Sequence, residues 1–399
     1  MEMTPGLRRD PAPDIEAVGQ DEDLVARIHA EIARDGPMTF ARFMDLALYD
    51  PAGGYYRAEA ARPGRDGDFL TAPETHPIFG AALARAIADA WQRMGRPEPF
   101  VMREYGAGSG TLAVAILDGL EREAPELAAH VRYEPIEVDP RRIEAIGSRL
   151  ASTGHMGAFA APSSSDASPI VGFVLANEVL DALPTHRVVM REGVLHEVRV
   201  GSRDGAFSDI ETDPSTPALA DRLAAEGVTL AEGQRAEIAL AVDPWLAEAA
   251  GGIGRGILLL IDYGYPAAEL YDPVRRGDGS LRAYLLHRVH ADPYRHVGRQ
   301  DLTAHVDVTA VERAVAAAGL AHLGTTTQAE FLVGLGTERL LQAIQSDPAT
   351  TLEDYLAVRS GLMRLLDPGA MGRFRVMAFG RGWPEGGPPL AGFGFRLQR

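Results

Sequence analysis

The stretch Phe100-Val-Met-Arg-Glu-Tyr-Gly-Ala-Gly-Ser-Gly110 has the pattern of a buried strand that runs into a glycine-rich turn and then a helix. Its first residues are apolar, Gly106, Gly108 and Gly110 form the turn, and an apolar helical pattern follows over 111–117. Glycines allow backbone conformations that side chains forbid, and the helix N-terminus directs free N–H groups toward a ligand. The stretch therefore predicts a strand–turn–helix unit that binds a ligand.

Acidic residues end two of the predicted strands. Glu104 stands just before the glycines, and Glu137 ends the next apolar stretch, 131–138. A carboxylate beside the glycines suits a cationic ligand better than the pyrophosphate of a dinucleotide, and S-adenosylmethionine carries an ammonium and a sulfonium group. Each acid taken alone is equally compatible with a helix cap or a turn residue.

The composition excludes several classes of protein. The chain has 399 residues, 46% of them hydrophobic, which is enough for one large core or two smaller ones. Its formal net charge of −17 argues against nucleic acid as a partner. The absence of cysteine and lysine excludes disulfides, thiolate catalysis and Schiff-base chemistry. No apolar run reaches membrane-spanning length and the first 22 residues lack signal-peptide features, so a cytoplasmic protein is expected.

From residue 100 onward, strand patterns alternate with helical patterns, which predicts a parallel α/β sheet with right-handed crossovers. Strands are predicted at 100–104, 131–138, 155–160, 171–176, 256–262, 323–327 and 374–379. Helices are predicted at 23–33, 38–49, 80–94, 111–123, 140–150, 216–250, 309–318 and 330–366, and a β-hairpin over 187–200.

Polar side chains gather where the predicted strands end. Because ligands of open α/β sheets sit beyond the carboxyl ends of the strands, these residues are expected to line one crevice: Glu104, Glu137, Asn177, Glu178 and Asp181. The histidines do not show the spacing of zinc ligands, so no metal site is expected.

Several motifs together resemble the MidA family of methyltransferases. The most selective is Ala176-Asn-Glu-Val-Leu-Asp-Ala-Leu-Pro184, and the others lie at 67–74, 104–112, 262–264 and 301–307. The resemblance implies a Rossmann-like, seven-stranded class I methyltransferase fold with S-adenosylmethionine as methyl donor. Mitochondrial members of the family assist assembly of respiratory complex I, which implies dimethylation of an arginine in a complex I subunit. Many relatives have Leu-Gly-Pro-Gly where this chain has Tyr105-Gly-Ala-Gly108.

With this resemblance, the chain is expected to divide in sequence order. The expected parts are a disordered tail (1–20), an N-terminal helical region with a cofactor-covering loop (21–98), a methyltransferase core with a hairpin insertion at 185–202 (99–264), an acceptor-side insertion (265–307) and a C-terminal part that completes the sheet with a helical insertion (308–399).

The candidate residues receive roles from their charge and position. Cofactor binding is assigned to the glycine turn and to the carboxylates Glu104, Glu137, Asp68 and Glu74, with Asp139 as the fallback for Glu137 at the ribose. An acceptor guanidinium requires acids that grip it and accept a proton, which indicates Asn177, Glu178 and Asp181 as catalytic residues. The remaining candidates form an acceptor wall: Asp262, Tyr263 and His305.

Two alternatives stay open at the level of sequence. One keeps the fold but has a small molecule as methyl acceptor. The other is an assembly chaperone that binds the cofactor without turnover. The leading interpretation expects a protein substrate, with a complex I subunit as the candidate, and neither nucleic acid nor an integral membrane segment.

Overall fold

The computed structural model describes residues 2–3, 15–57, 71–161, 169–384 and 386–397. The chain forms two compact units, each built from three stretches of sequence. The first unit contains Met1–Leu70, Leu180–Trp245 and Gly264–Ala314. The second contains Thr71–Val179, Leu246–Tyr263 and Val315–Arg399. The two units are described separately.

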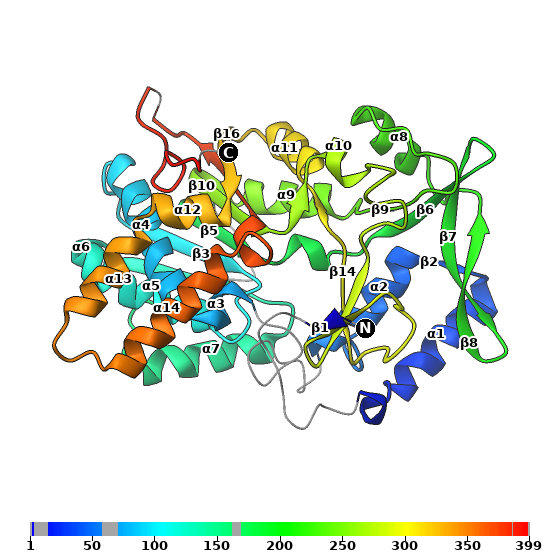
Figure 1. Cartoon of the computed structure of the whole chain (residues 1–399), viewed down its shortest axis with the longest axis horizontal. Coiled ribbons are helices and arrows are strands. Elements are labelled where there is room, and N and C mark those ends of the chain that lie inside the picture. The colour runs from blue at the N-terminus through cyan, green and yellow to red at the C-terminus, as the bar shows by residue number, and fades with distance from the viewer. Residues whose placement is uncertain (1, 4–14, 58–70, 162–168, 385, 398–399) are drawn as a thin grey trace. The chain divides into compact units, whose positions relative to one another are not determined.

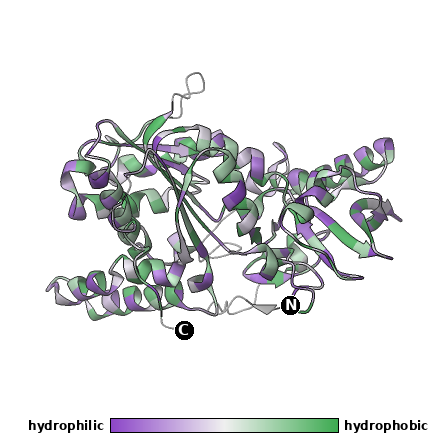
Figure 2. Ribbon diagram, turned by 90° about the horizontal axis from the view of Figure 1, so that it is seen from above, coloured by the Kyte–Doolittle hydropathy of each residue, from purple (hydrophilic) through white to green (hydrophobic). Residues whose placement is uncertain are grey.

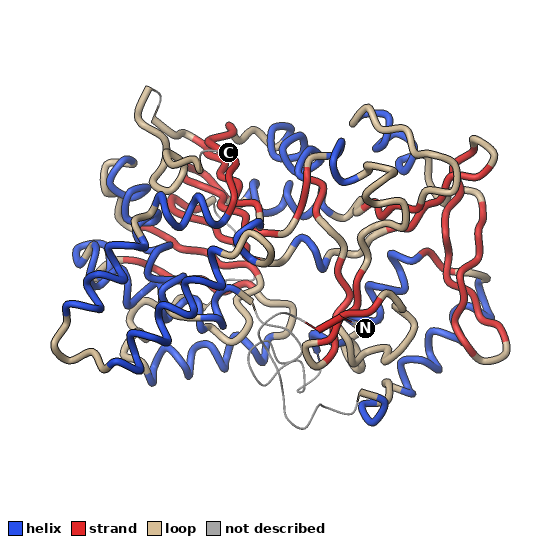
Figure 3. Tube along the Cα trace, in the orientation of Figure 1, coloured by secondary structure: helices blue, strands red, loops and turns tan. Residues whose placement is uncertain are grey.

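The second unit is organised around a six-stranded sheet in the order β16-β17-β10-β5-β3-β4, drawn in red in Figure 3. β4, β3, β5 and β10 run parallel, whereas β17 is antiparallel to both β10 and β16. The bounds are β3 Phe100–Tyr105, β4 Val131–Ile136, β5 Ile170–Asn177, β10 Ile253–Asp262, β16 Ala321–Thr327 and β17 Arg375–Arg381. Near the strand predicted at 155–160, Phe159 forms an isolated parallel bridge with Tyr133 of β4.

The central strands β5 and β10 are apolar over most of their length because both faces of the sheet are covered. The helices of this unit are α3 Ala72–Thr75, α4 Ile78–Arg93, α5 Thr111–Glu123, α6 Pro125–Ala128, α7 Pro140–Ser152, α12 Gln328–Gly334, α13 Thr337–Ser346 and α14 Leu352–Leu366. Figure 2 shows that many of these helices carry both hydrophobic and hydrophilic residues. α4 and α5 pack against each other and contribute most of their apolar residues to the core.

Among its described residues, the first unit contains three smaller sheets (Figure 1). One has the order β1-β13-β12-β14, with bounds Glu2–Met3, Arg288–His290, Arg282–Leu285 and Asp301–Thr303. A second joins β2 Met38–Thr39, β7 Val194–Arg203, β6 His186–Arg191 and β9 Arg235–Ile238, with β8 Ala206–Thr212 on β7. The third pairs β11 Gly264–Tyr265 with β15 Val306–Asp307.

The first unit also contains helices. They are α1 Glu22–Asp35, α2 Phe40–Tyr49, α8 Ala218–Ala225 and α10 Ala267–Leu270. Two further helices, α9 Val242–Gly251 and α11 Val308–Ala317, each begin in the first unit and end in the second. None of the described helices is both long and apolar enough to cross a membrane.

Three expectations need correction. Residues 21–98 do not form one region, because α1 and α2 belong to the first unit and α4 to the second. Within the expected helix at 216–250, Arg235–Ile238 form β9, because they pair with β6, a partner that local periodicity cannot reveal. Within the expected disordered tail, Glu2–Met3 pair with β13 and a 3-10 helix forms at Glu16–Val18, whereas residues 1 and 4–14 lie outside the described residues.

Candidate functional site

The glycine turn lies between β3 and α5, as the sequence predicts. Gly106, Gly108 and Gly110 have φ angles of 67°, 57° and 74°, in the left-handed region that favours glycine. A Cβ added to Gly106 would lie 2.8 Å from Cγ2 of Val179. The glycines therefore allow the tight turn, in which the N–H groups of Gly106, Gly108 and Gly110 donate to the carbonyl of Ile136, to Oε1 of Glu137 and to the carbonyl of Ala107.

Glu104 is buried at the end of β3, where only 3% of the residue is exposed. The hydroxyl of Tyr133 donates a hydrogen bond of 2.7 Å to its Oε2. Burial raises the pKa of Glu104 to about 8, the Tyr133 hydrogen bond opposes this rise, and the charge of Glu137 adds to it. A cation placed beside this carboxyl group would favour its ionised form, so Glu104 fits the ammonium of the cofactor.

Glu137 reaches the glycine turn directly. The backbone N–H of Gly108 donates to its Oε1, and this bond together with the charge of Arg142 opposes the rise in pKa that burial causes. Asp139, the fallback for the same role, accepts hydrogen bonds from the backbone and side chain of Arg141 and caps α7. Of the two acids, Glu137 is therefore the one that contacts the turn.

The loop before α4 contacts the turn as well. Ser109 donates a hydrogen bond of 3.0 Å from its hydroxyl to Oε1 of Glu74, which lies in α3. Asp68, the other predicted carboxylate of this loop, lies outside the described residues. Glu74 thus holds the tip of the glycine turn through a side-chain contact that the sequence alone does not show.

A strained turn follows β5. Asn177 ends the strand, and Glu178 has a φ of 53°, which is uncommon for a residue with a side chain. Oε1 of Glu178 accepts hydrogen bonds from the backbone N–H of Ala72 at 3.2 Å and from Nδ2 of Asn177 at 3.1 Å. Oδ1 of Asn177 is buried and accepts no hydrogen bond from the described residues. The turn therefore offers a fixed carboxylate and an unused amide oxygen.

Asp262 supports this turn from the neighbouring strand. It is 1% exposed at the end of β10, where its Oδ2 accepts the backbone N–H of Val179 at 3.2 Å and its Oδ1 that of Tyr263 at 2.8 Å. The backbone N–H of Glu178 also donates to the carbonyl of Ile261 at 2.8 Å. Asp262, predicted as part of an acceptor wall, therefore holds the backbone on which Glu178 stands.

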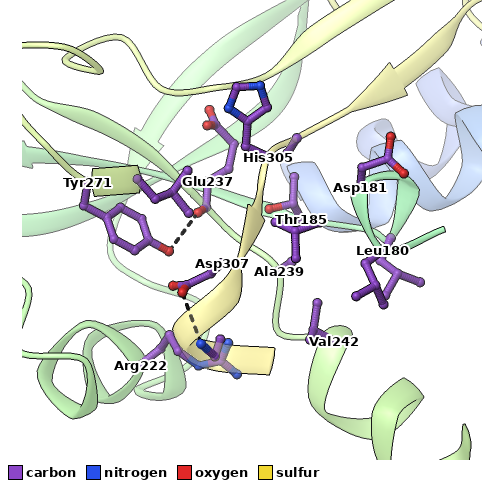
Figure 4. A pocket seen from close by; sticks show the side chains of 15 residues that line it. Leu180, Asp181, Thr185, Arg222, Glu237, Ala239, Val242, Tyr271, His305 and Asp307 are labelled. Carbon is purple, nitrogen blue, oxygen red and sulfur yellow. Dashed lines mark hydrogen bonds between the residues drawn. The ribbon is translucent and has the colours of Figure 1, made fainter. Parts of the chain in front are cut away.

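Two other predicted residues, Asp181 and His305, lie in the first unit, around the pocket in Figure 4. Asp181 is 5% exposed, and its backbone carbonyl accepts the N–H of Ala304 at 2.9 Å. His305 lies with its Nδ1 2.8 Å from a guanidinium nitrogen of Arg276. Asp181 and His305 thus line one pocket, whereas Tyr263, the third predicted wall residue, belongs to the second unit.

Sequence reasoning missed an acid pair near this pocket. The side chain of Glu226 has no exposed surface, and its Oε1 lies 3.5 Å from Arg222 and 3.2 Å from Arg313. Burial raises the pKa of Glu226 to about 8, with further rises from the hydrogen bond and charge of Asp307 and opposition from both arginines. Asp307 belongs to a quoted motif, but nothing in the sequence marks Glu226.

The candidate residues thus fall into two groups. The second unit brings together the glycine turn with Glu104, Glu137 and Glu74, and it carries the turn with Asn177, Glu178 and Asp262. The first unit holds Asp181 and His305. In the described part of the chain, no three histidines, aspartates or glutamates are arranged to hold a metal ion.

Comparison with known proteins gives consistent results. A family model described as "Putative S-adenosyl-L-methionine-dependent methyltransferase" matches residues 82–326. The mitochondrial protein arginine methyltransferase NDUFAF7 homologue of Drosophila melanogaster is 29% identical, over 93% of this chain and 88% of its own length. Protein arginine methyltransferase NDUFAF7 of Xenopus laevis, also mitochondrial, is 28% identical over 94% of this chain and 90% of its own.

A solved structure resembles the whole chain. A crystal structure from Burkholderia thailandensis with bound S-adenosylhomocysteine is 32% identical, covers 97% of this chain and 98% of that one, and has a TM-score of 0.84. The family model covers more than half of this chain, and the solved structure covers nearly all of it. These findings confirm the expected fold, enzyme class and cofactor, and the chain belongs to this family of S-adenosylmethionine-dependent methyltransferases.

Proposed function

We propose that this methyltransferase modifies an arginine side chain of a protein, with a subunit of respiratory complex I as the candidate substrate. Relatives that match nearly the whole chain are named protein arginine methyltransferases, which supports an arginine acceptor. The observation that carries the proposal is the Asn177-Glu178 turn, where a partly exposed carboxylate is fixed in a strained backbone conformation directly after β5.

The chemistry of the acceptor explains why this turn is suited to it. A guanidinium presents N–H donors in a planar fork that a carboxylate binds with charge-assisted hydrogen bonds. Glu178 supplies the carboxylate, and Oδ1 of Asn177 supplies a buried acceptor for a further N–H group. Glu178 would orient one acceptor nitrogen and accept its proton.

The cofactor would be held by residues of the second unit alone. When bound, S-adenosylmethionine supplies an electrophilic methyl group on a sulfonium. Glu104 would hold the ammonium of its methionyl part, and Glu137, which accepts the N–H of Gly108, would also accept hydrogen bonds from the ribose hydroxyls. Glu74 would keep the turn in place through Ser109.

Methyl-labelled S-adenosylmethionine tests the acceptor class. The purified full-length enzyme is incubated with the label and with extract from cells in which its gene is deleted, and protein and small-molecule fractions are then separated. We expect label in protein, recovered after hydrolysis as methylarginine, and peptide mass spectrometry to place it on a complex I subunit. Excess S-adenosylhomocysteine is the control that should suppress the label.

The two alternatives give different results in the same experiment. A small-molecule methyltransferase would put the label into the low-molecular-weight fraction. A chaperone without turnover would bind S-adenosylmethionine in a calorimetric titration but leave both fractions unlabelled. Either result would overturn the proposal of an arginine acceptor.

A further inference from the structure

The side chain of Asp262 joins two loops at the carboxyl edge of the sheet in the second unit. Its Oδ2 accepts the backbone N–H of Val179, after β5, at 3.2 Å, and its Oδ1 accepts that of Tyr263, after β10, at 2.8 Å. β5 and β10 are parallel neighbours, with Asn177 in register with Ile261 at this edge. One carboxylate therefore connects the residues that follow two adjacent strands, all of them in the second unit.

The turn held in this way contains the strained residue Glu178. A φ of 53° is unfavourable for a residue with a Cβ, so the surrounding contacts have to impose it. The backbone N–H of Glu178 donates to the carbonyl of Ile261 at 2.8 Å, and the N–H of the next residue, Val179, donates to Asp262. Of these two backbone contacts, the one to Asp262 is made by a side chain and can therefore be removed by substitution.

Val179 also sets the spacing between this turn and the glycine turn. A Cβ added to Gly106 would lie 2.8 Å from Cγ2 of Val179, which is closer than real Cβ contacts come, so the side chain of Val179 packs directly on the backbone of Gly106. Val179 is thus held at its N–H by Asp262 and at its side chain by the glycine turn. Because Glu178 precedes Val179 in the chain, both contacts determine where the Glu178 carboxylate lies relative to the cofactor-binding turn.

Asp262 itself is only 1% exposed, and each of its oxygens is engaged by a backbone N–H group, so its contacts are with the protein. We infer that Asp262 is a positioning residue for methyl transfer, which acts through Val179 and holds the Glu178 carboxylate in the direction that an acceptor guanidinium requires. This inference rests on the proposed function of Glu178. The geometry of attack is sensitive, since a displacement of about 1 Å costs about 100-fold in rate.

Asp262→Asn tests the inference, because asparagine has nearly the same size but offers one acceptor oxygen instead of two. One backbone N–H then loses its acceptor, and the turn is free to relax. We expect the rate at saturating acceptor to fall at least about tenfold, with the affinity for S-adenosylmethionine within about twofold of wild type. Methyl-labelled S-adenosylmethionine and a dilution series of extract from gene-deleted cells measure the rate, and calorimetric titration measures the affinity.

A double variant separates positioning from stability. In Glu178→Ala, which lacks the carboxylate, Asp262 has nothing to position, so adding Asp262→Asn should lower the residual rate by less than about twofold. The midpoint of thermal unfolding should nevertheless fall by the same amount in both backgrounds, because the backbone contact that is lost is the same in both proteins.

Val179→Ala changes the same contacts from the other side and provides the test if Asp262→Asn does not fold. It keeps the backbone N–H that Asp262 accepts but removes the methyl groups that pack on Gly106, so the spacing between the two turns is lost. We expect the rate at saturating acceptor to fall about three- to tenfold, again without a further loss in the Glu178→Ala background.

Glu197→Gln is the matched control. Glu197 is a fully buried carboxylate of the first unit that also accepts a backbone N–H, that of Ser215, and its replacement should leave the rate within about twofold of wild type. Full methyl transfer by Glu178→Ala would overturn the proposed function and this inference with it. A loss in Glu178→Ala combined with a wild-type rate in Asp262→Asn, or with losses that multiply in the double variant, would overturn the inference alone.

Discussion

In each unit, a glutamate among the described residues has a buried side chain and a pKa raised to about 8, but the two carboxyl groups have different neighbours. Glu104, in the second unit, is influenced by the hydroxyl of Tyr133 and the charge of Glu137, neither of which is cationic. Glu226, in the first unit, lies against Arg222 and Arg313. The electrostatic partner of Glu226 is thus part of the chain, whereas the cation that would ionise Glu104 has to come from a ligand.

This difference separates a binding group from a structural one. Burial costs free energy for an ionised carboxylate, and the fixed charges of Arg222 and Arg313 oppose that cost for Glu226 whether or not a ligand is bound. Glu104 has no such partner among the groups that shift its pKa, so cofactor binding should change its ionisation. The acid pair that contains Glu226 should respond to pH but not to the cofactor.

The largest expected effect is on cofactor affinity. Glu104→Ala should weaken binding of S-adenosylmethionine by roughly 100-fold, because it removes a buried charge-assisted hydrogen bond. Glu226→Gln should leave the affinity within about twofold of the wild type. Calorimetric titration of both variants measures the effect, and equal losses in both would erase the distinction between the two glutamates.

The pH dependence of cofactor binding is the second test. Unliganded Glu104 holds its proton up to a pKa of about 8, so binding of a cation releases that proton. Affinity for S-adenosylmethionine should therefore rise between pH 6 and 8, by at most about tenfold per pH unit, and level off above 8. Glu104→Gln should lose this rise, and titrations at several pH values would refute the assignment if both proteins gave parallel curves.

The difference in stability between Glu226→Gln and the wild type should depend on pH. Its direction should be opposite to that of a variant that removes an ordinary salt-bridged carboxylate. A folded-state pKa raised to about 8 stabilises the fold fully below the unfolded pKa, and this contribution is lost as the pH rises through 8. The glutamine of the variant cannot ionise, so the variant does not lose this stability as the pH rises. Its free energy of unfolding relative to wild type should therefore increase by about 1–2 kcal/mol between pH 5 and 8.5. Urea unfolding at both pH values measures this, and a constant difference would contradict it.

The smallest effect is expected for Tyr133→Phe. Removing the hydroxyl leaves Oε2 of Glu104 without its 2.7 Å hydrogen bond and should cost about 1 kcal/mol of stability. Because that bond lowers the pKa of Glu104, its loss should also move the pH midpoint of cofactor binding upward. A midpoint that stays in place would show that Tyr133 does not tune Glu104.

Features that a single stretch of sequence encodes were predicted well. The strand–turn–helix of 100–117 is confirmed as β3, the glycine turn and α5, because glycine spacing and apolar periodicity are local. The strand predicted at 171–176 is confirmed as β5 for the same reason. Relations between distant stretches were not predictable, as the pairing of β9 with β6 and of Glu226 with Asp307 shows.

Hydrogen-bond direction was the second limit of the sequence. Asp262 stands at a strand end, as predicted, but its position did not reveal that both of its oxygens accept backbone N–H groups. In the same way, nothing in the sequence shows that Ser109 donates to Glu74. Such contacts depend on side-chain orientation, which periodicity and motif spacing do not encode.

The most direct test of the whole account measures cofactor binding and methyl transfer in one variant, Glu178→Gln. Gln keeps the size of the side chain and its contact with Ala72 but cannot accept the proton of the acceptor. The account predicts an affinity for S-adenosylmethionine within about twofold of wild type and methyl transfer to protein arginine reduced at least about 100-fold. Unchanged methyl transfer in this variant would contradict the role of the turn after β5.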